Sequence, residues 1–116
     1  MNLSMINKVK NALLSIEVDG VPFENIGHFQ AFEAMNPPFI VWAEDNEYGS
    51  LEADDYKVGQ TLEGTIDLFT LTDNDPLFDA IQNALNAVKI FFRLNSVQYE
   101  DETELIHYEW IWRVQG

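Results

Sequence analysis

Apolar and polar residues alternate along residues 60–71, and this is the clearest periodic pattern in the chain. Successive side chains of a β-strand point to opposite faces of the sheet, so a period of two predicts a strand. We expect its apolar face to be buried and its polar face to stay wet or to be covered by a partner. The positions expected on the buried face are Leu62, Gly64, Ile66, Leu68 and Thr70.

Three more segments carry strand patterns. The apolar run FIVWAE at 39–44 follows Pro37-Pro38, which excludes a helix there and begins an extended segment. Residues 90–99 and 104–114 flank the polar turn EDETE and predict two further strands. Residues 21–36 have no clean period and fit either a short strand or an irregular arm. One alternate set in the last strand is apolar throughout, and we expect it to be buried in the core or against a neighbour: Ile106, Tyr108, Trp110, Trp112 and Val114.

Two segments have the period of an amphipathic helix. In residues 3–16, apolar side chains recur at spacings of three and four, with Asn2 or Ser4 as the N-cap. Asp19-Gly20 then turns the chain. The second helix follows DNDP, where Asp75 is a good N-cap and Pro76 suits the first helical position. The expected apolar stripes are Ile6, Val9, Leu13 and Ile16 in the first helix, and Leu77, Ile81, Ala84, Leu85 and Val88 in the second.

The order of these elements predicts an α+β fold. It consists of an antiparallel or mixed sheet of about four to five strands, with two helices packed on one face. At 116 residues the chain has the length of one domain, 1–116, that can bury a core without disulfides. It contains no cysteine.

The charge of the chain narrows the range of partners. Six Lys and Arg against twenty Asp and Glu give a net charge of −14. This argues against specific binding of nucleic acid, which needs cations to displace counterions from phosphates. A solvated acidic surface, repulsion of a polyanion and mimicry of one all remain open. No run approaches the roughly 18–20 apolar residues of a membrane span, and we expect no membrane association.

The residues at 45–59, DNEYGSLEADDYKVG, predict a long mobile loop, because they are polar and contain two glycines. Together with Glu44, the loop gathers carboxylates that a metal-dependent enzyme could use. However, a two-metal nuclease needs carboxylates held on rigid elements, and Lys57 is the nearest cation. The carboxylates concerned are Glu44, Asp45, Glu47, Glu52, Asp54 and Asp55.

Other catalytic signatures are missing. DND at 73–75 begins like a calcium loop, but Phe78 and Ala84 stand where the required Gly and Glu would be. The two histidines, His28 and His107, have no cysteine or Gly-x-Ser-x-Gly nucleophile to serve, and His107 is expected at a surface or interface. We therefore expect no enzymatic activity, no cofactor and no metal.

The sequence resembles the tail-terminator, or tail-completion, proteins of long-tailed bacteriophages, and more loosely the neighbouring head–tail joining proteins. The segments that carry the resemblance are PPFIVWAED at 37–45, ADDY at 53–56, GTIDLFTLTDNDPLFDAIQNAL at 64–85 and IHYEWIWRV at 106–114. They match in the order of elements along 1–116 rather than in a catalytic motif.

The resemblance implies a structural, non-enzymatic subunit. Such proteins form a ring, commonly a hexamer, on the head-proximal end of the tail tube, and the ring ends polymerisation and joins the capsid. The implied partners are other copies of the chain, the tail-tube protein and head–tail connector proteins, in a virion tail assembled in the bacterial cytoplasm. Acidic side chains on the channel would repel passing DNA. The candidate interface or channel residues are Glu47, Tyr48, Glu52, Asp54, Asp55 and Tyr56.

Two other functions fit the same sequence. An acidic DNA mimic that inhibits a DNA-binding protein would also carry a charge of −14. Its carboxylates would be spread along helix faces, whereas here they gather in loops. Another head–tail connector or completion protein would have the same features as a terminator.

Overall fold

The structure is a computed structural model that describes residues 2–31, 36–48 and 60–115. Within these residues the chain forms two helices and seven strands. In chain order they are α1 (Leu3–Leu14), β1 (Glu17–Val18), β2 (Val21–Pro22), β3 (Ile26–His28), β4 (Phe39–Tyr48), β5 (Thr61–Thr70), α2 (Leu77–Ala87), β6 (Phe91–Glu100) and β7 (Leu105–Gln115).

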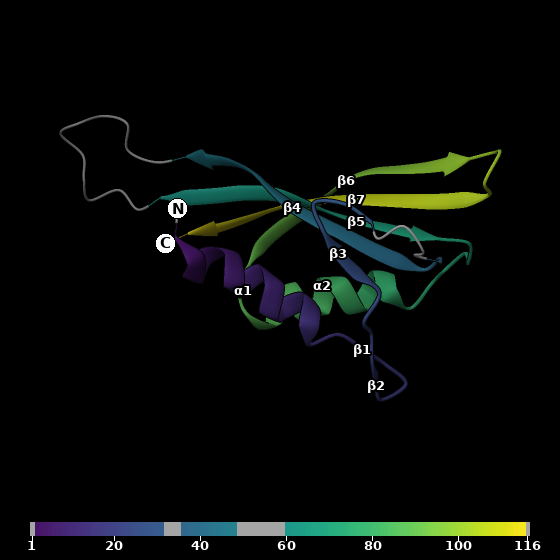
Figure 1. The fold of residues 1–116 in the computed structure, drawn as a ribbon, viewed down its shortest axis with the longest axis horizontal. Helices are drawn as coiled ribbons and strands as arrows, with labels where there is room; N and C mark the ends of the chain where they lie inside the picture. The colour runs from purple at the N-terminus through teal and green to yellow at the C-terminus, as the bar shows by residue number, and fades with distance from the viewer. Residues whose placement is uncertain (1, 32–35, 49–59, 116) are drawn as a thin grey trace.

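Five of the strands form one mixed sheet in the order β3-β4-β5-β7-β6. The β3–β4 pair is parallel and the other pairs are antiparallel. Both helices lie on the same face of this sheet (Figure 1), which confirms the predicted α+β fold. The ambiguous segment 21–36 contains β3 and β2, and β2 pairs with β1, which precedes the segment, in a separate two-stranded hairpin. We call the sheet face under the helices the helix face, and the opposite one the open face.

The core lies between the helix face and the two helices. Even-numbered residues of β5 and β7 point into it, and Trp110 and Trp112 are completely buried. The predicted alternation along β5 is confirmed, since its burial changes at every residue. The helices contribute Met5, Val9, Ala12, Leu13, Leu77, Ile81 and Leu85.

The turn residues lie where the sequence predicts turns, but one end of each helix is shifted: α1 ends early, and the cap position of α2 falls on Pro76 rather than on the predicted Asp75. Asn2 caps α1 by accepting a hydrogen bond from the Met5 amide over 3.1 Å, and the helix ends at Leu14 rather than at residue 16. Asp19 and Gly20 connect β1 to β2 with φ angles of 53° and 79°. Two residues with positive φ make the tight hairpin turn that DG pairs favour.

Asp75 joins β5 to the start of α2. Its Oδ1 accepts from the Leu77 amide at 2.9 Å, and its Oδ2 accepts from the Thr70 hydroxyl at 2.6 Å. Thr70 is completely buried and Asp75 is 8% exposed. The same carboxylate therefore starts the helix and satisfies a buried hydroxyl.

Asp75→Ala is expected to lower the free energy of unfolding by about 2 kcal/mol, because it removes a helix cap and leaves the buried Thr70 hydroxyl without its acceptor. Urea unfolding followed by circular dichroism measures this change. Asp73→Ala, at an exposed position in the same turn, is the matched control and should change stability by less than about 0.5 kcal/mol. Equal effects of the two substitutions would contradict the assignment.

The predicted loop at 45–59 is wrong at its start, because residues 45–48 continue β4. Asn46, Glu47 and Tyr48 pair with residues 63, 62 and 61 of β5, after a β-bulge between Glu44 and Asn46. The polar sequence gave no strand signal, yet the neighbouring strand supplies the backbone partners. Residues 49–59 lie outside the described residues, and four of the candidate interface residues lie there: Glu52, Asp54, Asp55 and Tyr56.

Candidate functional site

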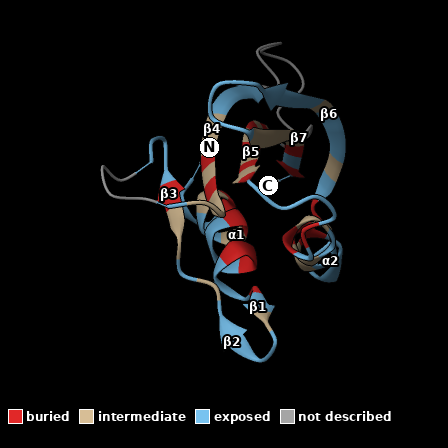
Figure 2. Cartoon of the chain, turned by 90° about the vertical axis from the view of Figure 1, so that its right-hand side faces the viewer, coloured by how far each residue is buried: buried red, intermediate tan, exposed pale blue. Residues whose placement is uncertain are grey.

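The open face of the sheet carries a band of interacting side chains across β4, β5, β7 and β6. At one end, three rings stack side by side: Phe39 on Phe69 at 4.8 Å between centroids, and Phe69 on His107 at 4.2 Å. These residues are neighbours in the strand registers. Neither helix covers this face, as the end-on view shows (Figure 2).

The middle of the open face is acidic. His107 Nε2 lies 2.7 Å from Asp67 Oδ1, and their side chains are only 21% and 17% exposed. Asn95 donates to Glu109 Oε1 at 2.7 Å and accepts from Arg93 at 2.9 Å. The network thus runs from β5 through β7 to the bulge of β6.

Two carboxyls of this face have raised pKa values. Burial raises the pKa of Asp67 above its ordinary value of 3.8, against a lowering by the hydrogen bond and charge of His107. Burial also raises the pKa of Asp45, and the negative charges of Glu63 and Glu109 add to this. Both carboxyls are therefore partly withdrawn from water and lie close to other carboxylates of the open face.

Asp67→Asn is expected to alter how stability depends on pH. Since the folded-state pKa of Asp67 is raised, the folded protein holds this proton more tightly than the unfolded chain does. The stabilisation from the protonated Asp67 carboxyl is complete at pH values below the unfolded-state pKa. It is lost as the pH rises through the folded-state pKa. We expect the stability of the wild type relative to Asp67→Asn to increase as the pH falls from about 7 to about 4, measured by urea unfolding at each pH.

The exposed Asp73→Asn variant serves as the control for general charge effects. A wild-type advantage that stays constant, or decreases, as the pH falls would contradict the prediction.

The other end of the open face is basic and hollow. A hollow of about 430 Å³ lies between the start of β6 and the end of β7. Both arginines of the chain line it, and Arg113 also pairs with Glu63 at 2.7 Å. We call it the arginine hollow. Its lining residues are Thr61, Phe91, Phe92, Arg93, Ile111, Arg113 and Gln115.

The helix face is left uncovered along β6. Leu94, Val97 and Tyr99 point to the same side as the buried residues of β7, yet they are 40%, 54% and 60% exposed. The hairpin of β6 and β7 projects beyond the ends of both helices (Figure 1). We call these three side chains the hairpin apolar strip. The sequence predicted an apolar set that the core or a neighbour would bury in the last strand, at 104–114, and made no such prediction for β6.

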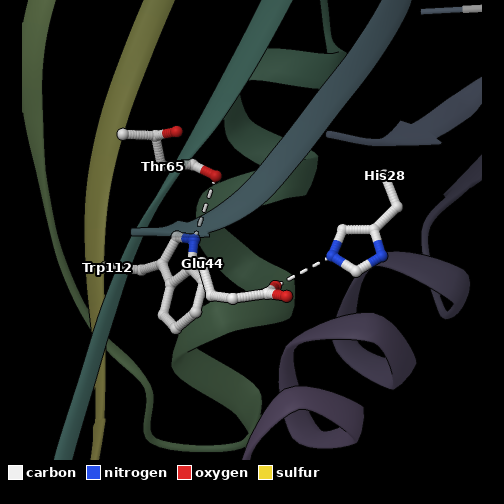
Figure 3. A network of polar contacts seen from close by, with 4 residues as sticks. All are labelled: His28, Glu44, Thr65 and Trp112. Atoms are coloured by element: carbon white, nitrogen blue, oxygen red, sulfur yellow. Dashed lines mark hydrogen bonds and ion pairs between the residues drawn. The ribbon is translucent and has the colours of Figure 1, made fainter. Parts of the chain in front are cut away.

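A His–Glu pair lies at the edge of the helix face. His28 Nε2 is 2.8 Å from Glu44 Oε2, while the Trp112 Nε1 donates to the Thr65 carbonyl at 3.0 Å (Figure 3). The His28 ring also stacks on Trp42 at 3.9 Å. These contacts fix β3 to β4.

The structure separates the acidic residues that the sequence groups. Glu44 bonds His28 on the helix face, whereas neighbouring Asp45 is influenced by Glu63 and Glu109 of the open face. Glu47 is exposed near the end of β4, and the backbone of Tyr48 pairs with Thr61. In the part of the chain that the structure describes, no three His, Asp or Glu side chains are arranged to hold a metal ion.

Sequence reasoning missed the arginine hollow and the hairpin apolar strip. A signal for the hollow was present, since the two arginines of the chain stand in two strands that flank one short turn. The sequence gives no signal for the strip, because apolar and polar residues do not alternate regularly along β6. Its bulge between Leu94 and Ser96 shifts the period by one residue.

The chain matches none of the known protein-family models, and no curated protein matches its sequence. Among the described residues, no helix has the length and apolarity that crossing a membrane requires.

Proposed function

We propose that this protein is a structural assembly subunit that caps a bacteriophage tail tube as a ring and presents the surface to which the head joins. The proposal combines the sequence resemblance to tail terminators with one observation, the exposed hairpin apolar strip. Its residues continue the core-facing side of the sheet without a cover from either helix. Apolar side chains exposed next to one another favour burial against a partner.

Burying this strip against a neighbouring subunit would lower the free energy of the assembly. Fully removing a side chain of the size of Leu, Val or Tyr from water contributes about 1.5–3 kcal/mol. The strip residues are already partly buried, so each contributes only part of that amount on association. Repeated around a ring, the gain recurs at every subunit contact.

The acidic middle of the open face fits the same function. Asp45, Asp67 and Glu109 lie near one another on the open face, and a surface of this sign repels DNA phosphates. A ring through which DNA passes needs a wall that does not retain it. We propose that the open face contributes to this wall.

Electron microscopy of the protein mixed with tubes assembled from a phage tail-tube protein tests the proposal. We expect a single ring at one tube end, and tubes that no longer lengthen after the protein is added. If the protein leaves tubes unchanged and instead competes with DNA for a DNA-binding protein, the acidic-mimic function replaces this proposal. A ring at the head-side connector without any effect on tube length would identify it as another connector protein.

A further inference from the structure

The turn between β6 and β7 carries four exposed carboxylates. They are Glu100, Asp101, Glu102 and Glu104, and we call this segment the acidic tip. The turn is held by hydrogen bonds from the Glu104 amide to the Glu100 carbonyl at 2.8 Å and from the Leu105 amide to the Thr103 hydroxyl at 3.3 Å. Within the described residues, no Lys or Arg forms an ion pair with these four carboxylates.

The arginine hollow lies at the other end of the same hairpin and has the opposite charge. No carboxylate is among the side chains that line it. Arg93 is exposed and uses Nη1 to bond Asn95, and a guanidinium has five N–H donors, so Arg93 can also bind a carboxylate. Arg113 is 58% exposed. Lys89, two residues before Phe91, brings a third cation to this end.

The acidic tip cannot reach the arginine hollow of its own chain. Phe91 and Glu100 are the two ends of one ten-residue strand, which places them about 30 Å apart at 3.3 Å per residue. The hollow lies at the start of β6 and the tip follows its end, so the two surfaces lie at opposite ends of the paired β6–β7 hairpin, whose strands are drawn in Figure 1. Any contact between them must therefore join two molecules.

We propose that the acidic tip of one copy binds the arginine hollow of the next through carboxylate–guanidinium pairs, in a head-to-tail contact. The inference rests on the proposed ring for the identity of the partner as a second copy. With a net charge of −14, two copies repel each other in most orientations. Docking a tip on a hollow brings opposite charges together, so it selects one orientation from many.

This contact has the symmetry that a ring requires. The contact joins two different surfaces, so each copy binds one neighbour through its tip and the other neighbour through its hollow. Arginine suits the role because its planar guanidinium binds a carboxylate through two parallel hydrogen bonds. Phe91, which is 69% exposed, and Ile111 also line the hollow, and a docked tip that covers them would exclude water from those bonds.

Cross-linking between cysteine variants tests the contact, because the native chain has no cysteine. One variant carries Thr103→Cys in the acidic tip and the other, with a tag of different size, carries Gln115→Cys in the arginine hollow. A short bis-maleimide should join the two variants to each other. Asn83→Cys, at an exposed position of α2, replaces Gln115→Cys as the matched control and should give little product.

Charge-reversal variants then distinguish cross-linking through the specific contact from cross-linking by random collision. Adding Asp101→Arg and Glu102→Arg to the tip variant should reduce the product about tenfold, as expected for the loss of close charge pairs. Adding Arg93→Glu to the hollow variant should restore it, and this exposed substitution leaves the Arg113–Glu63 pair in place. Product that is absent, equal at Asn83→Cys or unaffected by reversal would overturn the inference.

The same variants distinguish this inference from the proposed function. If the Arg93→Glu variant caps tail tubes as well as the wild type does, the ring forms by another contact and the tip–hollow contact is wrong. If tip and hollow cross-link specifically but the protein never caps a tube, the contact is supported and the tail function is wrong.

Discussion

Gly64→Val is expected to unfold the protein or to lower its free energy of unfolding by more than about 3 kcal/mol. Gly64 lies on the helix face of β5, opposite Glu44 of β4 and Trp112 of β7. A Cβ atom at this position would collide with the carbonyl oxygen of Ala43 and with the indole of Trp112. The first of these is backbone in a paired strand, so it cannot move aside without breaking the sheet.

The indole has no easy alternative position either. Trp112 is completely buried and its Nε1 donates to the Thr65 carbonyl at 3.0 Å. Rotating the ring would leave that N–H without an acceptor in the core, which itself costs about 1–3 kcal/mol. The sheet can therefore accept only glycine at residue 64.

Urea unfolding followed by tryptophan fluorescence measures the effect of Gly64→Val. Thr65→Val, the next residue on the open face, is the matched control and should stay within about 1 kcal/mol of the wild type. A cooperative transition of Gly64→Val at the wild-type urea midpoint would contradict the close approach of β4, β5 and β7 at residue 64.

Replacing all three residues of the hairpin apolar strip by threonine is expected to weaken capping of tail tubes while the fold is kept. Leu94, Val97 and Tyr99 are 40–60% exposed, so the monomer loses little burial. Threonine also retains a high preference for strands. The proposed assembly, in contrast, loses an apolar contact at every subunit boundary, and we expect at least about tenfold more protein to be needed for capping.

Tube-end counts by electron microscopy over a protein titration measure this effect, and circular dichroism establishes that the variant is folded. Val21→Thr, at an apolar residue that is 64% exposed on the β1–β2 hairpin, is the matched control and should cap normally. Normal capping by the folded triple variant would remove the observation on which the proposed function rests.

Local sequence patterns predicted most of the elements, because their causes are local. The alternation in β5 follows from the pleat of a strand, and the start of α2 follows from the capping chemistry of Asp75 and Pro76. The Asp19-Gly20 turn is also local, since both residues accept positive φ. The tail-terminator function inferred from the resemblance stays a prediction.

The errors fall where a neighbouring strand, rather than local sequence, sets the conformation. Residues 45–48 became part of β4 because β5 supplies their hydrogen-bond partners across a bulge. Phe91 and Tyr99 are as aromatic as the buried Trp110, yet they are 69% and 60% exposed. Periodicity does not reveal how far a helix extends over a sheet, so it cannot tell a core aromatic residue from an exposed one.

The sequence by itself determined the α+β class, the charge of −14 and which alternate residues of β5 face the core, since each depends on composition or on neighbours along the chain. The tertiary structure decided which distant side chains meet. The pairing of β6 with β7 brings Arg93 and Arg113 to one hollow, and the same pairing holds the acidic tip about 30 Å away. Strand register and bulges set these distances, and they depend on backbone hydrogen bonds between segments that are remote in the sequence.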